Sequence, residues 1–187
     1  PSNERGMLDL DEVDVLLHPR DVPQPRIGLI EMENTHGSTG GRVLSVEDTV
    51  AIVDLAHRNG VPVHIDGARF FNAVVATGTT PTQLSGGADT ITFCLSKGLS
   101  APFGSMLCGN REDMARARVV KKSLGGGLRQ SGIMAAAGIV ALETMVERLA
   151  EDHENAAVLA RGLAQLPGVV LNPEDVETNQ VYFEVTF

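Results

Sequence analysis

The chain has 187 residues, of which 43% are hydrophobic, and its 24 acidic and 15 basic side chains give a formal net charge of −9. This length suits one domain with a real core, or one large domain and part of a second. The acidic balance argues against nucleic acids and anionic membranes as partners. No run of sequence approaches the roughly 20 apolar residues of a membrane span.

Cysteine usage and the start of the chain bear on the compartment. The two cysteines, Cys94 and Cys108, lie in apolar runs. We expect buried free thiols rather than a disulfide or metal ligands, and we predict no metal site. No secretory signal peptide is visible, so we expect a cytoplasmic location, with a mitochondrial location left open.

The first part of the chain predicts a helix, a link and a strand. Residues 8–17 have the pattern of a short acidic helix, and a proline-rich link runs from Pro19 to Pro25. An apolar strand over Ile27–Met32 then ends in the sequence E-N-T-H, which contains His36. The next segment, Gly37–Arg42, has neither common phosphate-loop pattern, so we interpret it as a loop that brings His36 to a crevice. A solvated histidine is the alternative.

A helix is predicted after this loop. Ser45 is placed to cap it, with Asp48 as its capping-box partner, and Gly60 ends it. The spacing of the apolar residues predicts a buried face made of Val46, Val50 and Val53.

The centre of the chain has the order of a β-α-β unit. Apolar runs over Val61–Ile65 and Ile91–Leu95 indicate strands buried on both faces of a parallel sheet. A helix-like segment, Phe70–Thr77, lies between them. Ligands of such sheets bind beyond the carboxyl ends of the strands. We therefore expect Asp66 and Lys97, which follow the two strands, to face one crevice.

An acid and a lysine at two strand ends, with Arg69 close to the acid in sequence, suit a pyridoxal phosphate site. Lys97 can form a Schiff base, and Asp66 can keep a pyridine nitrogen protonated. The ordinary alternatives are a solvated lysine at a strand end and an aspartate that belongs to a turn. The position of both residues in one β-α-β unit favours the site.

Beyond Lys97 the sequence predicts a bend over residues 98–102 and another strand over Phe103–Cys108. Asn110 is placed to cap a basic helix, with Asp113 at the capping-box position. Most of the basic side chains of this helix are expected to form a solvated face.

The sequence S-L-G-G-G-L-R-Q-S-G covers residues 123–132. Three consecutive glycines allow a backbone to approach a ligand or a neighbouring chain closely. Lys122 and Arg129 flank them, and a cofactor phosphate needs such cations. The alternative is a turn between two helices with an ordinary surface arginine.

The last part of the chain predicts a second unit. Helices are expected over Ile133–Ala150 and Glu151–Leu166, followed by strands over Val169–Leu171 and Val181–Phe187. We interpret residues 1–150 as a large α/β domain and residues 151–187 as the start of a small α+β domain.

Four motifs, in this order, together resemble the low-specificity L-threonine aldolases: E-N-T-H, H-I-D-G-A-R, C-L-S-K-G-L-S-A-P and G-G-G-L-R-Q-S-G. The resemblance extends over nearly the whole chain. It implies the fold type I of pyridoxal phosphate enzymes, which is like that of aspartate aminotransferase, with a mostly parallel sheet flanked by helices. It also implies homodimers or homotetramers, and cleavage of L-threonine and L-allo-threonine to glycine and acetaldehyde.

The resemblance implies a role for each candidate residue. Lys97 would form the Schiff base, and Asp66 would pair with the pyridine nitrogen of the cofactor. Arg69 would hold the substrate carboxylate, and His36 would lie beside the substrate β-hydroxyl. The residues that resemble contacts to the cofactor phosphate are Lys122 and Arg129.

Family members are nearly twice as long as this chain, so the resemblance also implies that the sequence is a fragment. The expected N-terminal part, which would carry a phosphate cup and a histidine stacked on the cofactor ring, is missing. Two alternatives stay open. One is another pyridoxal phosphate reaction, namely β-elimination, racemisation or transamination, and the other is a non-catalytic fragment.

Overall fold

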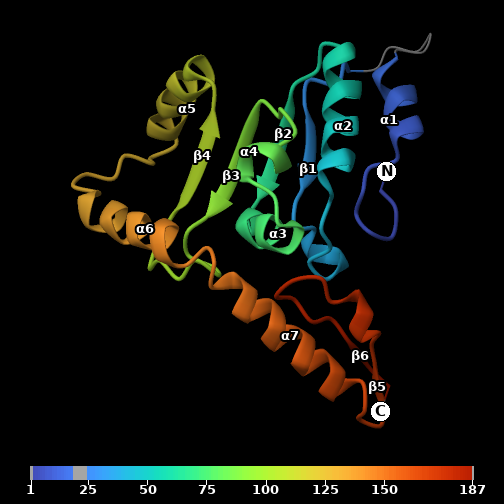
Figure 1. Cartoon of the computed structure of the whole chain (residues 1–187). Coiled ribbons are helices and arrows are strands. Elements are labelled where there is room, and N and C mark those ends of the chain that lie inside the picture. Colours follow the sequence, from blue (N-terminus) through green and yellow to red (C-terminus); the bar gives the residue numbers. More distant parts are fainter. Residues whose placement is uncertain (1, 19–24, 187) are drawn as a thin grey trace.

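The structure, a computed structural model, describes residues 2–18 and 25–186. The larger sheet has the strand order β1-β2-β3-β4 (Figure 1). Its first three strands are parallel, and the fourth is antiparallel to the third. The strand bounds are β1 Ile30–Glu33, β2 Val63–Gly67, β3 Thr90–Cys94 and β4 Ser105–Gly109. A mostly parallel sheet was predicted, and it is confirmed.

Seven α-helices lie within the described residues, and they alternate with the strands in the first half of the chain (Figure 1). Two 3-10 helices also occur, η1 over Gly37–Thr39 and η2 over Pro173–Asp175. The α-helices are α1 Leu10–Leu17, α2 Val46–Arg58, α3 Phe70–Thr77, α4 Pro81–Leu84, α5 Arg111–Ser123, α6 Gly132–Thr144 and α7 Leu149–Leu163. The predicted proline-rich link falls mainly on residues 19–24, which lie outside the described residues.

The start of α2 matches its prediction, but its buried face does not. Ser45 Oγ accepts the N–H of Asp48, and the Asp48 carboxylate accepts the N–H of Ser45, which completes the capping box. Val50, however, is 37% exposed. The stripe that faces the core contains Thr49, Ile52, Val53 and Ala56, which also have helical spacing. The predicted face was therefore wrong at Val50, because two apolar stripes overlap on this helix.

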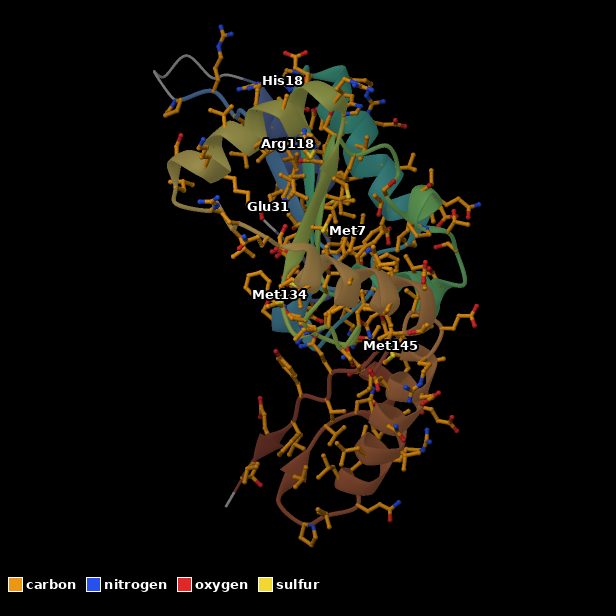
Figure 2. The ribbon with its side chains drawn as sticks, turned by 90° about the vertical axis from the view of Figure 1, so that its left-hand side faces the viewer. Met7, His18, Glu31, Arg118, Met134 and Met145 are labelled. Atoms are coloured by element: carbon orange, nitrogen blue, oxygen red, sulfur yellow. The ribbon has the colours of Figure 1, made fainter. Side chains whose placement is uncertain are left out.

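The main core lies between the sheet and the helices of the first half of the chain. Val63 and Ile65 of β2 are fully buried and belong to the same apolar cluster as Ile52 of α2. Because side chains alternate along a strand, His64 and Asp66 lie on the other face of the sheet. In Figure 2 α2 and α5 lie on opposite sides of the strands.

The β3–β4 side of the sheet is less buried than the sequence predicts. All residues of β3 are partly exposed, and all residues of β4 are exposed. Cys94 and Cys108 are free thiols, as predicted, but Cys94 is only half-buried and Cys108 is exposed. The prediction of a strand buried on both faces was wrong for β3, and the prediction of buried thiols was wrong at Cys108. The reason is that in the described chain β4 is the last strand of the sheet, and α5 is the helix that mainly contacts it.

The predicted boundary between the last two long helices was also wrong. One helix was expected to extend to Ala150, but α6 ends at Thr144 and α7 begins at Leu149. The N–H of Leu149 donates to the carbonyl of Val146 in the intervening turn. The acidic residues Glu151 and Asp152 therefore fall in the first turn of α7, where carboxylates interact favourably with the helix dipole.

A small unit follows α7 (Figure 1). Strands β5, Val169–Val170, and β6, Glu184–Val185, pair antiparallel and are shorter than predicted. The proposed domain boundary after residue 150 falls in the first turn of α7, and the division into two domains stays a prediction. Within the described residues, no helix has both the length and the apolar character needed to cross a membrane.

Candidate active site

Three of the predicted site residues come from adjacent parallel strands. Asp66 lies near the end of β2, opposite Glu33 at the end of β1 and Thr92 of β3. His36 follows β1, and Lys97 follows β3. The carboxyl ends of the parallel strands meet at one edge of the sheet, so the fold brings these segments together as the sequence predicts.

The bend that carries Lys97 is anchored by apolar residues on both sides. Leu95 and Leu99 are buried and belong to a second apolar cluster that also contains Leu149 of α7. The N–H of Ser100 donates to the carbonyl of Lys97 over 2.8 Å, and Ser100 has a left-handed φ of 61°. Non-glycine residues adopt this conformation at an energetic cost and are often found at functional sites. Lys97 itself is exposed.

Asp66 has the turn role that the sequence left open, and one of its carboxylate oxygens stays available for the predicted site role. Its Oδ1 accepts the N–H of Ala68 over 3.0 Å, which is the expected turn chemistry. Its backbone carbonyl accepts the N–H of Asn34 over 3.0 Å, and this bond joins the end of β2 to the segment before His36. Among the described residues, no hydrogen bond occupies the second carboxylate oxygen of Asp66.

Arg69 lies at the N-terminus of α3, directly after the Asp66 turn. It is half-buried and lines a cavity of about 10 Å³ together with Cys94 and Gly98. In the described part of the chain, its guanidinium takes part in no ion pair. Arg69 therefore lies between the ends of β2 and β3 with its charge available to a ligand.

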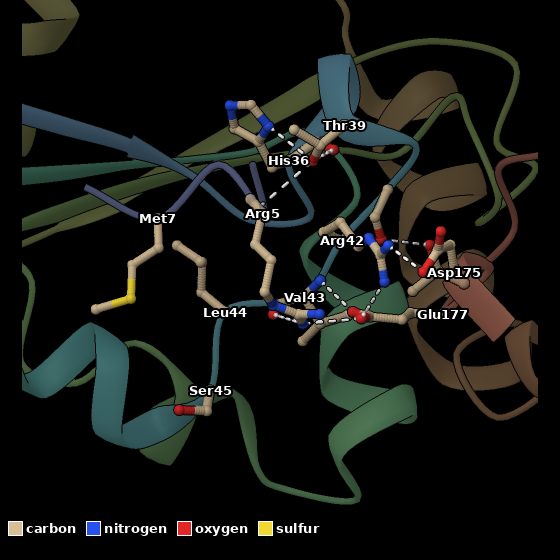
Figure 3. Close-up of polar contacts among 12 residues, drawn as sticks. Arg5, Met7, His36, Thr39, Arg42, Val43, Leu44, Ser45, Asp175 and Glu177 are labelled. Carbon is tan, nitrogen blue, oxygen red and sulfur yellow. Dashed lines mark hydrogen bonds and ion pairs between the residues drawn. The ribbon is translucent and has the colours of Figure 1, made fainter. Parts of the chain in front are cut away.

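His36 is held by its neighbours and is not a freely solvated histidine. Its side chain is 18% exposed, and its Nε2 lies 3.9 Å from the Glu33 carboxylate. Its Nδ1 lies 3.0 Å from Thr39 Oγ1 (Figure 3). Gly6 packs so closely that a Cβ there would lie 2.2 Å from the imidazole ring. These contacts fix the position of the ring.

The loop that contains His36 is tied to the C-terminal part of the chain (Figure 3). The Arg42 guanidinium contacts the Asp175 carboxylate at 2.6 Å and the Glu177 carboxylate at 2.9 Å. The hydroxyl of Thr178 donates to the carbonyl of Gly41 over 2.8 Å. Sequence reasoning missed these contacts, because the partners lie more than 130 positions apart.

The charges in this cluster stabilise one another. Burial alone would lower the pKa of Arg42, but hydrogen bonds with Asp175 and Glu177 outweigh burial and raise the pKa. Burial alone would raise the pKa of Glu177. The N–H of Val43 and the guanidinium groups of Arg42 and Arg5 instead hold that pKa below its ordinary value of 4.5. Arg42 and Glu177 therefore stay ionised at neutral pH, and their ion pair fixes the loop.

In the part of the chain that the structure describes, Lys122 and Arg129 are not held by ion pairs of the kind that hold Arg42. Both are exposed, near the end of α5 and in the segment that follows it. The N–H groups of Gly125 and Gly126 donate to the carbonyls of Lys122 and Lys121, which is a Schellman helix end. The first two glycines therefore have the structural role of a helix turn, and the phosphate contacts of Lys122 and Arg129 stay a prediction.

A groove of about 520 Å³ was not predicted. It lies between α5 and the face of β3 and β4 that continues from Asp66 through Thr92. Lys121 lines this groove, whereas the sequence predicts a role for its neighbour Lys122. The helical spacing of the α5 residues that line the groove was the available signal: Met114, Ala117, Arg118 and Lys121.

The residues at the strand ends fit pyridoxal phosphate by their chemistry. The site offers an exposed amine at Lys97, one carboxylate oxygen of Asp66 without a partner, and a guanidinium at Arg69. In the described chain none of these three groups is consumed by an ion pair, in contrast to Arg42 and Glu177. This donor set can bind an aldehyde, a pyridine nitrogen and a carboxylate.

Solved structures share the fold of this chain. A putative L-allo-threonine aldolase from Listeria monocytogenes superposes with a TM-score of 0.80 at 22% identity, over 94% of this chain and 47% of that chain. A putative aromatic amino acid β-eliminating lyase/threonine aldolase from Exiguobacterium gives a TM-score of 0.76 at 27% identity, over 83% of this chain and 44% of that chain. The predicted α/β fold of the aspartate aminotransferase type is confirmed.

The sequence is similar to curated proteins along almost its whole length. It is 42% identical to low-specificity L-threonine aldolase 1 of Arabidopsis thaliana over 98% of this chain and 52% of that protein. It is 43% identical to the low specificity L-threonine aldolase of Escherichia coli K12 over 96% of this chain and 52% of that protein. The chain thus spans about half the length of these curated relatives. Residues 1–186 match the β-eliminating lyase family, and the chain belongs to that family.

Proposed function

We propose that the protein cleaves L-threonine and L-allo-threonine to glycine and acetaldehyde in a pyridoxal phosphate-dependent retro-aldol reaction. The observation that carries the proposal is the placement of His36, Asp66 and Lys97 at the ends of three adjacent parallel strands. Support also comes from the relatives in Arabidopsis and Escherichia coli, which are named low-specificity L-threonine aldolases.

Lys97, Asp66 and Arg69 would form the cofactor side of the site. The amine of Lys97 would hold the cofactor aldehyde, and the free oxygen of Asp66 would accept a hydrogen bond from the pyridine N–H and keep that nitrogen protonated. When bound, pyridoxal phosphate supplies an electron sink for the electron pair left at the substrate Cα. Lys122 and Arg129 are the proposed phosphate contacts.

Arg69 would hold the substrate. Its guanidinium can grip a carboxylate through two hydrogen bonds, and a fixed carboxylate decides which bond at Cα is oriented for cleavage. The position of Arg69 directly after the Asp66 turn, beside the proposed cofactor residues, supports this role.

His36 would take the proton of the substrate β-hydroxyl, directly or through a water molecule. The contact of Nδ1 with Thr39 leaves Nε2 as the nitrogen that can accept this proton. The Glu33 carboxylate, 3.9 Å from Nε2, would stabilise the imidazolium that forms. A histidine suits this task because its unperturbed pKa of about 6.5 lies near neutral pH.

The test is a product assay. The protein product that contains this chain is incubated with pyridoxal phosphate and either L-threonine or L-allo-threonine, and acetaldehyde, glycine, ammonia and keto acids are measured. Equal amounts of acetaldehyde and glycine are expected. Ammonia with a keto acid would instead assign β-elimination to the site, and a keto acid without ammonia would assign transamination. No turnover of either substrate would contradict the proposal.

We also propose that the protein forms a homodimer or homotetramer. Its partner of low molecular weight would be an amino-acid substrate, and its location would be the cytoplasm. Large apolar side chains are exposed on α5, on α6 and between them, as interfaces between subunits require. These side chains are Val119, Val120, Leu124, Leu128, Ile133, Ile139 and Val140. Light scattering would show a mass of at least two chains, and a monomer at micromolar concentration would contradict this proposal.

A further inference from the structure

A partly buried polar contact joins α3 to α7. Asn72 of α3 is only 2% exposed, and its Nδ2 lies 3.1 Å from Nε2 of His153 of α7. An amide nitrogen only donates, so the imidazole accepts at Nε2 and carries its proton on Nδ1. The contact therefore requires neutral His153.

This contact lies near the bend that carries Lys97. A Cβ at Gly98 would lie 2.6 Å from Leu149 Cδ2, 3.6 Å from Asn72 Oδ1 and 3.7 Å from Asp152 Oδ2. The Gly98 backbone, next to Lys97, therefore lies close to Leu149 of α7 and to Asn72 of α3, which contacts His153.

We propose that His153 is a positioning residue: its neutral imidazole holds Asn72, and Asn72 in turn supports the Gly98 backbone and so the place of Lys97. The part assigned to Lys97 rests on the proposed function, whereas the mechanical support of the bend does not. Small displacements of a reacting group are costly in catalysis, so a residue that never touches substrate can still set the rate.

Protonation of His153 would remove this support, because an imidazolium has no acceptor at Nε2. Burial lowers the pKa of His153, and the Asp152 carboxylate opposes this effect. The neutral form therefore persists to a lower pH than in a free histidine. The charged groups of the elements that pack on α7 are Lys97 on the bend and Glu174 and Asp175 on η2, whereas α3 has no ionisable side chain.

Hydrogen exchange of the protein without cofactor tests the support. The N–H groups of Ser100 and Ala101 are bonded within the bend and report its opening. In His153→Leu, exchange over residues 95–101 should be about five- to tenfold faster than in the unchanged protein, the effect of one lost hydrogen bond. His153→Gln keeps an acceptor and should stay near the unchanged protein. The control is His18→Gln, an exposed position directly after α1, which should leave exchange of the bend unchanged.

A pH series gives a second measurement, which remains decisive if His153→Leu does not fold. After correction for intrinsic exchange, the bend of the unchanged protein should open as the pH falls through the pKa of His153, and the bend of His153→Gln should not. Equal pH responses would overturn the proposal. Two results for His153→Leu would also overturn it. One is exchange of the bend that is no faster than in the unchanged protein. The other is exchange of β2 that increases by the same factor as exchange of the bend.

Kinetic measurements distinguish failure of the role of His153 from failure of the proposed function. In the protein with cofactor, His153→Leu should lower kcat with little change in KM. In the pH profile of kcat, His153→Gln should lack the decrease at low pH that protonation of His153 causes. If exchange responds as expected but no glycine or acetaldehyde forms, the proposed function fails and the support of the bend stands. If the products form but exchange does not respond, only the role of His153 fails.

Discussion

Two glycine-rich segments of this chain differ in burial and in their contacts with the rest of the protein. Residues 37–42 form a partly buried loop that is held by ion pairs and hydrogen bonds from residues 175–178. Residues 123–132 are largely exposed, and their glycines serve mainly to end α5. Similar composition therefore produces a tightly held loop in one place and a helix turn in the other, because only the first segment has partners far away in sequence.

The difference also changes what each glycine does. A Cβ at Gly41 would lie 2.6 Å from Thr178 Oγ1, and the φ of this residue is +78°. A Cβ at Gly127 would have no heavy atom within 4 Å. Gly41 is thus required by both packing and backbone conformation, whereas Gly127 is required by neither.

The largest difference in stability is expected between substitutions of two arginines, one in each segment. Arg42→Ala should lower the free energy of unfolding by about 2–3 kcal/mol, because it removes charged hydrogen bonds and leaves Glu177 poorly compensated. Arg129→Ala should change the free energy of unfolding by less than about 0.5 kcal/mol, since Arg129 is exposed. Urea unfolding measures both, and equal effects would contradict the distinction between the two segments.

Substitution of one glycine in each segment tests the same difference in stability. Gly41→Ala should destabilise the protein by about 2 kcal/mol, from the left-handed backbone and from displacement of Thr178. Gly127→Ala should be neutral, or stabilising by up to about 1 kcal/mol through the unfolded chain. Thermal and urea unfolding of the two variants provide the comparison, and a Gly127→Ala protein that is as unstable as Gly41→Ala would refute it.

A smaller effect is expected from pH. The pKa of Glu177 is lower in the folded protein than its ordinary value of 4.5, so its stabilising contribution is complete above that value. This contribution disappears as the pH falls through the folded pKa. The Tm difference between the unchanged protein and Glu177→Gln should therefore shrink between about pH 6 and about pH 3. A difference that stays constant over this range would show that the carboxylate charge contributes nothing.

Much of the first half of the chain could be predicted because its signals are local. The cap at Ser45 and the helix Phe70–Thr77 depend on residues within one or two turns, and both appear as expected. The order of the strand ends that carry Asp66 and Lys97 follows from the β-α-β pattern. These features need no knowledge of distant partners.

The features that could not be predicted depend on contacts between distant segments. The pair Arg42–Glu177 joins residues 135 positions apart, and Asn72–His153 joins residues 81 positions apart, so neither leaves a periodic pattern. The predicted burial of β3 and of Cys108 was wrong for a related reason, because an apolar strand is buried only where another segment covers it. The break before Leu149 was overlooked since both sides of it favour helix.

The central claim is that Lys97 is the residue that binds pyridoxal phosphate, and its most direct test is chemical labelling. The protein is incubated with an equimolar amount of pyridoxal phosphate, reduced with borohydride and digested, and the pyridoxyl group is located by mass spectrometry. The label should be on Lys97, and Lys97→Ala should lose the label and roughly 10³-fold or more of its activity. A label on Lys121 or Lys122, with Lys97 unmodified, would contradict this account of the site.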